Sequence, residues 1–237
     1  MKKNQLLTFC GILISLFLLS SCEEKEEEEQ EGKKAYVDLG LPSGTLWATC
    51  NVGATSPEDY GDYFAWGETE PYDENGKTYY EWSTYKWCNG NYIKLSKYCN
   101  KSDCGMFGFT DTLTELEPED DAACAKWGTD WRMPSLAQIK ELINSSYTTS
   151  EWITLHGVNG LKVTSISNGN SIFLPAAGYR IGSSLYDAGS NCSYWSCSLY
   201  SDNPLCAYSL DVVSSRVSTD DDDRGVGFSV RSVRLKE

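Results

Sequence analysis

Cysteines, carboxylates and a single histidine are the residues of this chain whose chemistry could serve catalysis or metal binding. The 237 residues hold ten Cys, 34 Asp and Glu, and one His, at position 156. One imidazole excludes a histidine-rich metal site, and the Leu-His-Gly context of His156 is typical of a loop. The sequence contains no G-x-S-x-G elbow, P-loop or dinucleotide fingerprint. We therefore do not expect an enzyme.

The cysteines could pair in disulfides or bind zinc. No C-x-x-C pair occurs, so the sequence excludes a zinc ribbon and a thioredoxin-like motif. Cys99 and Cys104 have four residues between them, as do Cys192 and Cys197. That spacing is compatible with a short disulfide loop but does not diagnose one, so the connectivity stays open.

Four consecutive carboxylates, Asp220 to Asp223, could hold a hard cation weakly. The run is not a calcium loop, because Arg224 stands where an oxygen ligand is required and no acid closes the loop. We expect a solvated acidic turn without a resident metal or other cofactor, with weak calcium binding at Asp220 and Asp222 as the alternative. Paired carboxylates for glycoside hydrolysis stay open, since no spacing singles out two of them.

The elements that position these groups include two predicted helices. The first covers 119–127, with Pro118 ahead of it and Gly128 behind it. The second begins at Ser135, and the spacing from Ser135 to Gln138 fits a capping box. Apolar residues at three- and four-residue spacing give this second helix one face for burial.

Strands are predicted for most of the remaining domain, apart from a long irregular stretch over 67–112. Asn168-Gly169 predicts a hairpin turn. The predicted strands cover 36–41, 45–50, 161–166, 171–174, 194–199, 207–213, 215–218 and 228–233. Two helices and a C-terminal antiparallel meander favour the α+β class in a single folded domain.

Residues 1–21 have the pattern of a lipoprotein signal peptide. Two lysines precede an apolar run over 6–19, which is shorter than the roughly 20 residues of a membrane-spanning helix. The run ends in Leu-Ser-Ser before Cys22, which resembles a bacterial lipobox, so we expect lipidation of Cys22. An ordinary secretory signal with a chance cysteine is the alternative.

Residues 22–34 are expected to be an acidic, disordered tether, because seven acids within nine residues repel one another. The segment resembles the signal that sends some lipoproteins to the outer face of the outer membrane. We therefore expect a lipid-anchored, surface-exposed outer-membrane protein, with a plain spacer as the alternative. Cleavage of the signal peptide would remove two lysines with residues 1–21, so the formal net charge would fall from −14 to −16. About −12 of this charge belongs to the folded part. This charge excludes nucleic acid as a partner, because phosphates are repelled.

Several longer motifs resemble one family more specifically than any of these features. They are VDLGLPSGTLWATCNVGA over 37–54, YFAWGET over 63–69, WRMPS over 131–135, FLPAAGYR over 173–180, YWS over 194–196 and SVR over 229–231. Their order and spacing resemble the Fibrobacter succinogenes major paralogous domain family, and we assign this domain to 35–237. The resemblance implies a C-type-lectin-like fold on secreted or lipid-anchored surface proteins, with two helices packed on antiparallel β-sheets and long irregular loops.

The aromatic and glycine positions of these motifs indicate a scaffold and not a ligand. The predicted core aromatics are Trp47, Trp66, Trp131 and Trp195, and the predicted turn glycines are Gly40, Gly44, Gly53, Gly67 and Gly178. The calcium–sugar motifs of C-type lectins are missing. The catalytic cysteines of the related formylglycine-generating enzymes have no matching positions, so neither activity is carried over.

Segment 199–228 resembles the variable region of proteins diversified by a retroelement, in which substitutions scatter over a binding face between fixed positions. Ordinary drift on exposed strands is the alternative. Alternation along a strand would let one face pack while the other varies. The predicted ligand-binding residues are Tyr200, Asp202, Leu205, Ser209, Asp211, Arg216, Ser218, Thr219, Asp221, Asp223 and Val226.

The expected function is therefore that of a surface-anchored lipoprotein with a ligand-binding or display domain. Its partner would be an unidentified protein or glycan, and its contact with the membrane would be the lipid anchor alone. Two alternatives stay open. One is an enzyme on a scaffold like that of the formylglycine-generating enzymes, or a hydrolase with two carboxylates of perturbed pKa. The other is a structural component of the cell envelope.

Overall fold

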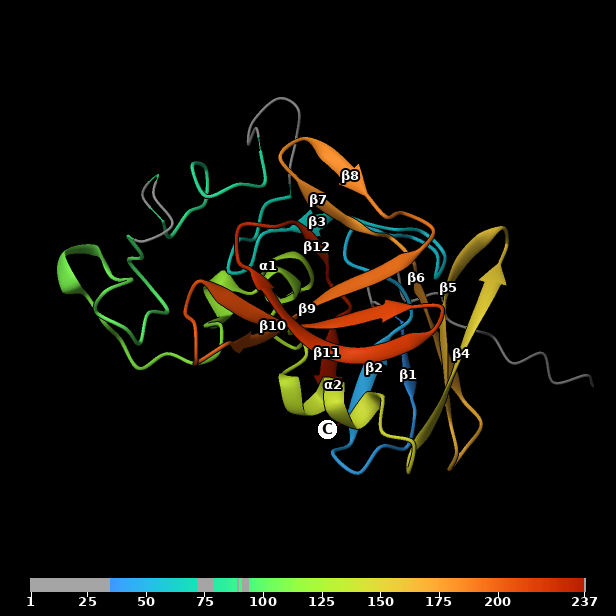
Figure 1. The fold of residues 1–237 in the computed structure, drawn as a ribbon. Coiled ribbons are helices and arrows are strands. Elements are labelled where there is room, and N and C mark those ends of the chain that lie inside the picture. Colours follow the sequence, from blue (N-terminus) through green and yellow to red (C-terminus); the bar gives the residue numbers. More distant parts are fainter. Residues whose placement is uncertain (1–34, 72–78, 89, 91–93, 237) are drawn as a thin grey trace, which may run out of the picture. The chain divides into compact units, whose positions relative to one another are not determined.

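The computed structural model describes residues 35–71, 79–88, 90 and 94–236 (Figure 1). The predicted signal peptide over 1–21, the tether over 22–34 and the lipidation site Cys22 lie outside the described residues. Among the described helices, none has the length and apolar character needed to cross a membrane.

Thirteen strands dominate the described residues. They are β1 (Tyr36–Asp38), β2 (Thr45–Ala48), β3 (Tyr63–Phe64), β4 (Thr148–Leu155), β5 (Val158–Ser165), β6 (Ser171–Pro175), β7 (Tyr179–Ile181), β8 (Ser184–Tyr186), β9 (Asn191–Leu199), β10 (Cys206–Val213), β11 (Arg216–Asp223), β12 (Phe228–Ser229) and β13 (Val233–Leu235). The helical segments in the same part of the chain are α1 (Ala122–Trp127), α2 (Leu136–Leu142) and the 3₁₀ turns η1 (Met106–Gly108) and η2 (Pro118–Asp120).

The expected α+β class, with two helices packed on the sheets of a C-type-lectin-like fold, is wrong in its helices and in its class. Of the described residues, 39% are in strands and 10% in helices, and the strands form several small sheets, so the domain is mostly β. Pro118 starts a 3₁₀ turn and not the predicted helix, which begins only after its cap Asp121 and ends at Trp127, with Gly128 as its C-cap. The capping box between Ser135 and Gln138 is confirmed, but α2 ends after about two turns. Helices of six and seven residues cannot form a layer of their own.

The central sheet has the strand order β11-β10-β9-β12-β3. Its two faces differ, because successive side chains of a strand point to opposite sides. On one side, Leu210 and Val212 pack in a core cluster with α2, β5 and β6; we call this the α2 face. On the other side, Trp195 and Ala207 pack with Phe228 and the start of α1; we call this the Trp195 face.

Three smaller antiparallel arrangements complete the fold. The sheets β1-β2-β13 and β4-β5-β6 contribute Trp47 and Leu161 to the cluster on the α2 face. The predicted hairpin at Asn168-Gly169 is confirmed, since β5 and β6 pair on either side of it. The hairpin of β7 and β8 contacts β9 and β12, and Figure 1 shows it as the orange ribbon beside β9.

The predicted core aromatics and turn glycines are confirmed. The four predicted tryptophans are at most 4% exposed. All five predicted glycines have positive φ, between 60° and 83°. Gly178 shows why one of them must be glycine, because a Cβ there would lie 2.0 Å from the carbonyl oxygen of Tyr186. The predicted irregular stretch 67–112 is confirmed as well, since regular structure among its described residues is limited to isolated β-bridges and the 3₁₀ turn η1.

Arg224 links this irregular stretch to the central sheet through hydrogen bonds. Its side chain is fully buried and donates hydrogen bonds to the Tyr85 hydroxyl at 2.9 Å and to the carbonyls of Tyr98 and Pro204 at 3.0 and 2.9 Å. The guanidinium also lies 4.7 Å from the ring centroid of Trp66. All of these partners are neutral, so Arg224 compensates its burial through hydrogen bonds and aromatic faces.

Candidate functional site

A hollow of about 310 Å³ opens on the Trp195 face of the central sheet, beside the β7–β8 hairpin. Its lining combines carboxylates with polar and apolar side chains, and we call it the acidic hollow. The carboxylates are Asp187, Asp211, Asp220 and Asp222, and the other lining residues are Tyr179, Ile181, Asn191, Ser193, Val226 and Phe228.

The strand register explains why three of these carboxylates come together. β10 and β11 pair Ser209 with Asp220 and Asp211 with Ser218. β9 and β10 pair Ser209 with Trp195. Residues directly opposite each other share a face, and so do residues two apart along a strand. Asp211, Asp220 and Asp222 therefore all project from the Trp195 face.

Only Asp211 among these three carboxylates has a cationic partner within the described part of the chain. Arg216 pairs with one of its carboxylate oxygens. The other oxygen accepts a hydrogen bond from the Asn191 side-chain amide at 3.1 Å. Asp220 and Asp222 form no ion pair with any described residue, so the hollow keeps uncompensated negative charge.

The crowded charges change the acidity of the half-buried Asp222. Burial raises its pKa, and the neighbouring carboxylates, led by Asp220 and Asp211, raise it further, to about 7. The carboxyl group therefore changes its charge close to neutral pH. A bound cation would relieve the repulsion and keep Asp222 ionised.

Ser209 lies on the same face but is fully buried and is not one of the residues that line the hollow. Aromatic side chains do line it and make it suitable for a ligand. Tyr179 and Phe228 form an aromatic wall, with their ring centroids 6.2 Å apart. Tyr179 also stacks on Tyr186 of β8 at 5.7 Å.

The predicted ligand-binding residues do not form one surface. Ser209, Asp211, Arg216 and Ser218 lie on the Trp195 face, and Val226 lines the hollow. The other residues of β11 in the prediction, Thr219, Asp221 and Asp223, lie on the α2 face, because Thr219 pairs with the core residue Leu210.

The remaining predicted residues lie at the end of β9 and in the turn that follows it. Tyr200 packs edge-on against Tyr208, with ring centroids 5.2 Å apart. The exposed Asp202 accepts a hydrogen bond from the Lys101 ammonium through its backbone carbonyl, at 2.6 Å. Leu205 packs against a core cluster of the irregular stretch. These three residues belong to supporting structure and not to the hollow.

Sequence reasoning missed the part of the hollow that precedes segment 199–228. Tyr179 and Asp187 come from the β7–β8 region, and Asn191 and Ser193 come from the start of β9. The sequence signal that could have found the hairpin is the FLPAAGYR motif, whose Gly178 has positive φ and lets the start of β7 pass close to the end of β8.

Calcium binding at Asp220 and Asp222 gains no support from geometry. In the described part of the chain, the acids whose oxygen atoms lie close enough together to share a metal ion, within 4.8 Å, are Glu117, Glu119 and Asp120, and not Asp220 and Asp222. The Lys97 ammonium already occupies that group, 2.7 Å from Asp120, where hydrogen bonds from lysines and Tyr98 outweigh burial and lower the Asp120 pKa. The acidic group is an internal ion-pair network.

The described cysteines and His156 do not come together in a catalytic arrangement. All eight described cysteines are free thiols. Cys192 packs in the cluster on the α2 face and Cys197 in that on the Trp195 face, so the two cannot pair. His156 lies in the β4–β5 turn, where its Nδ1 is 2.8 Å from the Glu58 carboxylate.

Comparisons with known proteins add no identification. Family models, curated proteins and solved structures were all searched, and none matched the chain.

Proposed function

We propose that the chain is a binding protein whose acidic hollow holds a cationic group of its ligand. The observation that carries this proposal is the convergence of Asp211, Asp220 and Asp222 on one face, where Arg216 pairs with Asp211 and no ion pair joins Asp220 or Asp222 to a described residue. Uncompensated carboxylates around a cavity favour a complementary cation and disfavour an anionic ligand.

The surroundings of the hollow favour a protein ligand that presents a lysine or arginine side chain. The β7–β8 hairpin exposes Ile181, Leu185 and Tyr186, which are 47%, 40% and 45% exposed. Such apolar side chains beside the acidic hollow suit a basic residue flanked by apolar ones. Tyr179 offers a ring face for the aliphatic part or the guanidinium of that residue.

The cellular setting is a proposal that rests on sequence. The lipobox before Cys22 and the acidic tether support a lipid-anchored protein displayed on the outer membrane. The six motifs over 37–231 support membership of the Fibrobacter succinogenes major paralogous domain family. A display role fits a binding site that is open to solvent.

Alternation along β11 provides a matched pair of variants to test the hollow. The double variant Asp220→Asn with Asp222→Asn removes two carboxyl groups from the hollow, and Asp221→Asn with Asp223→Asn removes two carboxyl groups from the opposite face. We expect the first to weaken binding of a fluorescently labelled hexalysine peptide about tenfold and the second by less than about twofold. Fluorescence anisotropy at low ionic strength measures both.

Equal losses from the two double variants would contradict the proposal, because they would show that the peptide responds to net charge alone. Absence of saturable binding to the unaltered protein would contradict it as well. That second result would favour a structural role in the cell envelope.

One observation favours a second candidate function, a carboxylate-based hydrolase. The raised pKa of Asp222, about 7, together with nearby ionised carboxylates, is the combination that general acid catalysis uses. Hydrolysis of aryl glycosides that is lost in Asp222→Asn and follows a pKa near 7 would establish this function. Retained activity in Asp222→Asn would exclude Asp222 as the acid.

A further inference from the structure

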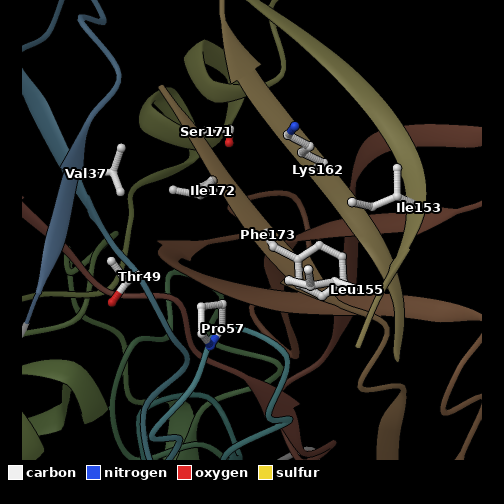
Figure 2. Close-up of a pocket in the computed structure, with 9 residues that line it drawn as sticks. All are labelled: Val37, Thr49, Pro57, Ile153, Leu155, Lys162, Ser171, Ile172 and Phe173. Atoms are coloured by element: carbon white, nitrogen blue, oxygen red, sulfur yellow. The ribbon is translucent and has the colours of Figure 1, made fainter. Parts of the chain in front are cut away.

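A second pocket, distinct from the acidic hollow, lies between β1 and the β4–β6 sheet (Figure 2). Its volume is about 340 Å³, at the lower end of the range for small-molecule sites. Figure 2 shows Val37, Thr49 and Pro57 on one side of it and side chains of the sheet on the other. Most of the lining side chains are apolar.

The pocket is apolar because the outer face of the β4–β6 sheet carries large hydrophobic residues and because Ile172, a residue of the core cluster, also lines it. β5 and β6 pair Leu161 with Leu174, and both lie in the core. The intervening positions, including Ile153 and Phe173, therefore point away from that core. Phe173 is only 5% exposed because its ring lies over Gly160, where a Cβ would come within 2.6 Å of the ring.

Lys162 is the one charged group among the described residues that line this pocket. It lies opposite Glu151 on β4, yet no ion pair joins Lys162 to any acid in the described part of the chain. The hydroxyl groups of Thr49 and Ser171 are the other polar groups of the lining. Lys162 is partly exposed, so it does not require a partner, but it offers one positive charge at an otherwise apolar pocket to an anionic group of a ligand.

Contacts at both ends hold the walls of the pocket in place. At one end, His156 Nδ1 lies 2.8 Å from Glu58 Oε1, which joins the β4–β5 turn to the loop that carries Pro57. At the other end, the Asn170 side-chain amide donates to the Asp38 carbonyl at 2.8 Å. The pocket is therefore formed before any ligand arrives, which lowers the entropy cost of binding.

We propose that this pocket binds a small amphiphile with an anionic head, such as a medium-chain alkyl carboxylate. Its apolar chain would lie against Ile153, Leu155 and Phe173, and its carboxylate would accept a hydrogen bond from the Lys162 ammonium. A cationic amphiphile would bring like charges together. A volume of about 340 Å³ suits a small ligand of this kind.

Isothermal titration calorimetry with decanoate, decylammonium and decanol, each below its micelle concentration, tests the proposal. We expect saturable binding of decanoate and at least about tenfold weaker binding of decylammonium. Lys162→Met keeps an apolar stem and is expected to weaken decanoate about tenfold, while decanol changes by less than about twofold. Lys140→Met, on the exposed side of α2, is the matched control and should change neither.

A second variant keeps the test decisive if Lys162→Met does not fold. Ile153→Glu places a carboxylate in the pocket from a half-buried position and should abolish decanoate binding while circular dichroism stays unchanged. The proposal is overturned if decanoate does not bind saturably or if decylammonium binds equally well. It is also overturned if a folded Lys162→Met matches Lys140→Met, or if Ile153→Glu still binds decanoate.

Discussion

Asp222 sits where the folded protein favours its neutral form. Burial and the charges of neighbouring aspartates raise its pKa from 3.8 to about 7. When the pKa of a carboxyl group is higher in the folded state, the free energy of unfolding is greatest below the unfolded pKa of about 4. It decreases as the pH rises from there to the folded pKa. Asp222→Asn removes this penalty, so we expect it to stabilise the protein above pH 7 and to have little effect at pH 4.

The magnitude follows from the size of the shift. A change of about three pKa units corresponds to roughly 4 kcal/mol, at about 1.36 kcal/mol per unit. Asp222 is half-buried, so solvent screens part of the interaction. We therefore expect Asp222→Asn to raise the free energy of unfolding by about 2 kcal/mol at pH 8.

Urea unfolding at pH 8 and pH 4, followed by tryptophan fluorescence, measures this difference. Asp223→Asn, the exposed neighbour on the opposite face of β11, is the control and should gain much less stability. The reasoning is refuted if Asp222→Asn gains the same stability at both pH values. Equal gains in the two variants at pH 8 would refute it too, because they would assign the effect to net charge.

Three further predictions concern the scaffold. Arg224→Lys should lower the free energy of unfolding, measured by guanidinium denaturation, by about 3 kcal/mol. The reason is that one ammonium group cannot reach all the acceptors that the buried guanidinium satisfies. A loss below about 1 kcal/mol would contradict this. Gly178→Ala should destabilise the protein far more than Gly44→Ala. Both glycines have a positive φ, but a Cβ at Gly178 would clash with the Tyr186 carbonyl, whereas no atom lies within 4 Å of the place that a Cβ at Gly44 would take. Equal melting temperatures of the two variants would contradict this clash. Cys192 and Cys197, buried with pKa values raised to about 12, should resist Ellman's reagent at pH 8 until the protein unfolds, and rapid labelling of either thiol in the native state would contradict their burial.

Local features of the fold could be predicted from the sequence because neighbouring residues determine them. The capping box at Ser135 depends on a hydroxyl and an amide three residues apart, and the turn at Asn168-Gly169 depends on backbone freedom at Gly169. The fold class was predicted wrongly, since Pro118 and the acids after it suit a 3₁₀ turn as well as a helix. The helix content is therefore lower than the pattern suggested.

The acidic hollow could be predicted only in part. Segment 199–228 does supply Asp211, Asp220, Asp222 and Val226 to it. The predicted ligand-binding residues include Asp221 and Asp223, which lie on the α2 face, and omit Asp220 and Asp222, which line the hollow, because a run of identical residues does not indicate which members point to which face. A shift of one residue in register exchanges the two faces of a strand.

The sequence by itself determined which residues must be buried and where the chain must turn. Within the motifs, tryptophan favours burial because it is large and mostly apolar, and glycine favours turns because a positive φ strains residues with a Cβ, so residue type indicates both there. Only the tertiary structure decided which charges meet. The pairing of β10 with β11 and the packing of the β7–β8 hairpin bring Asp187, Asp211 and Asp222 to one hollow from separate parts of the chain. Electrostatic interactions depend on distance in space, and distance in space is set by register and packing.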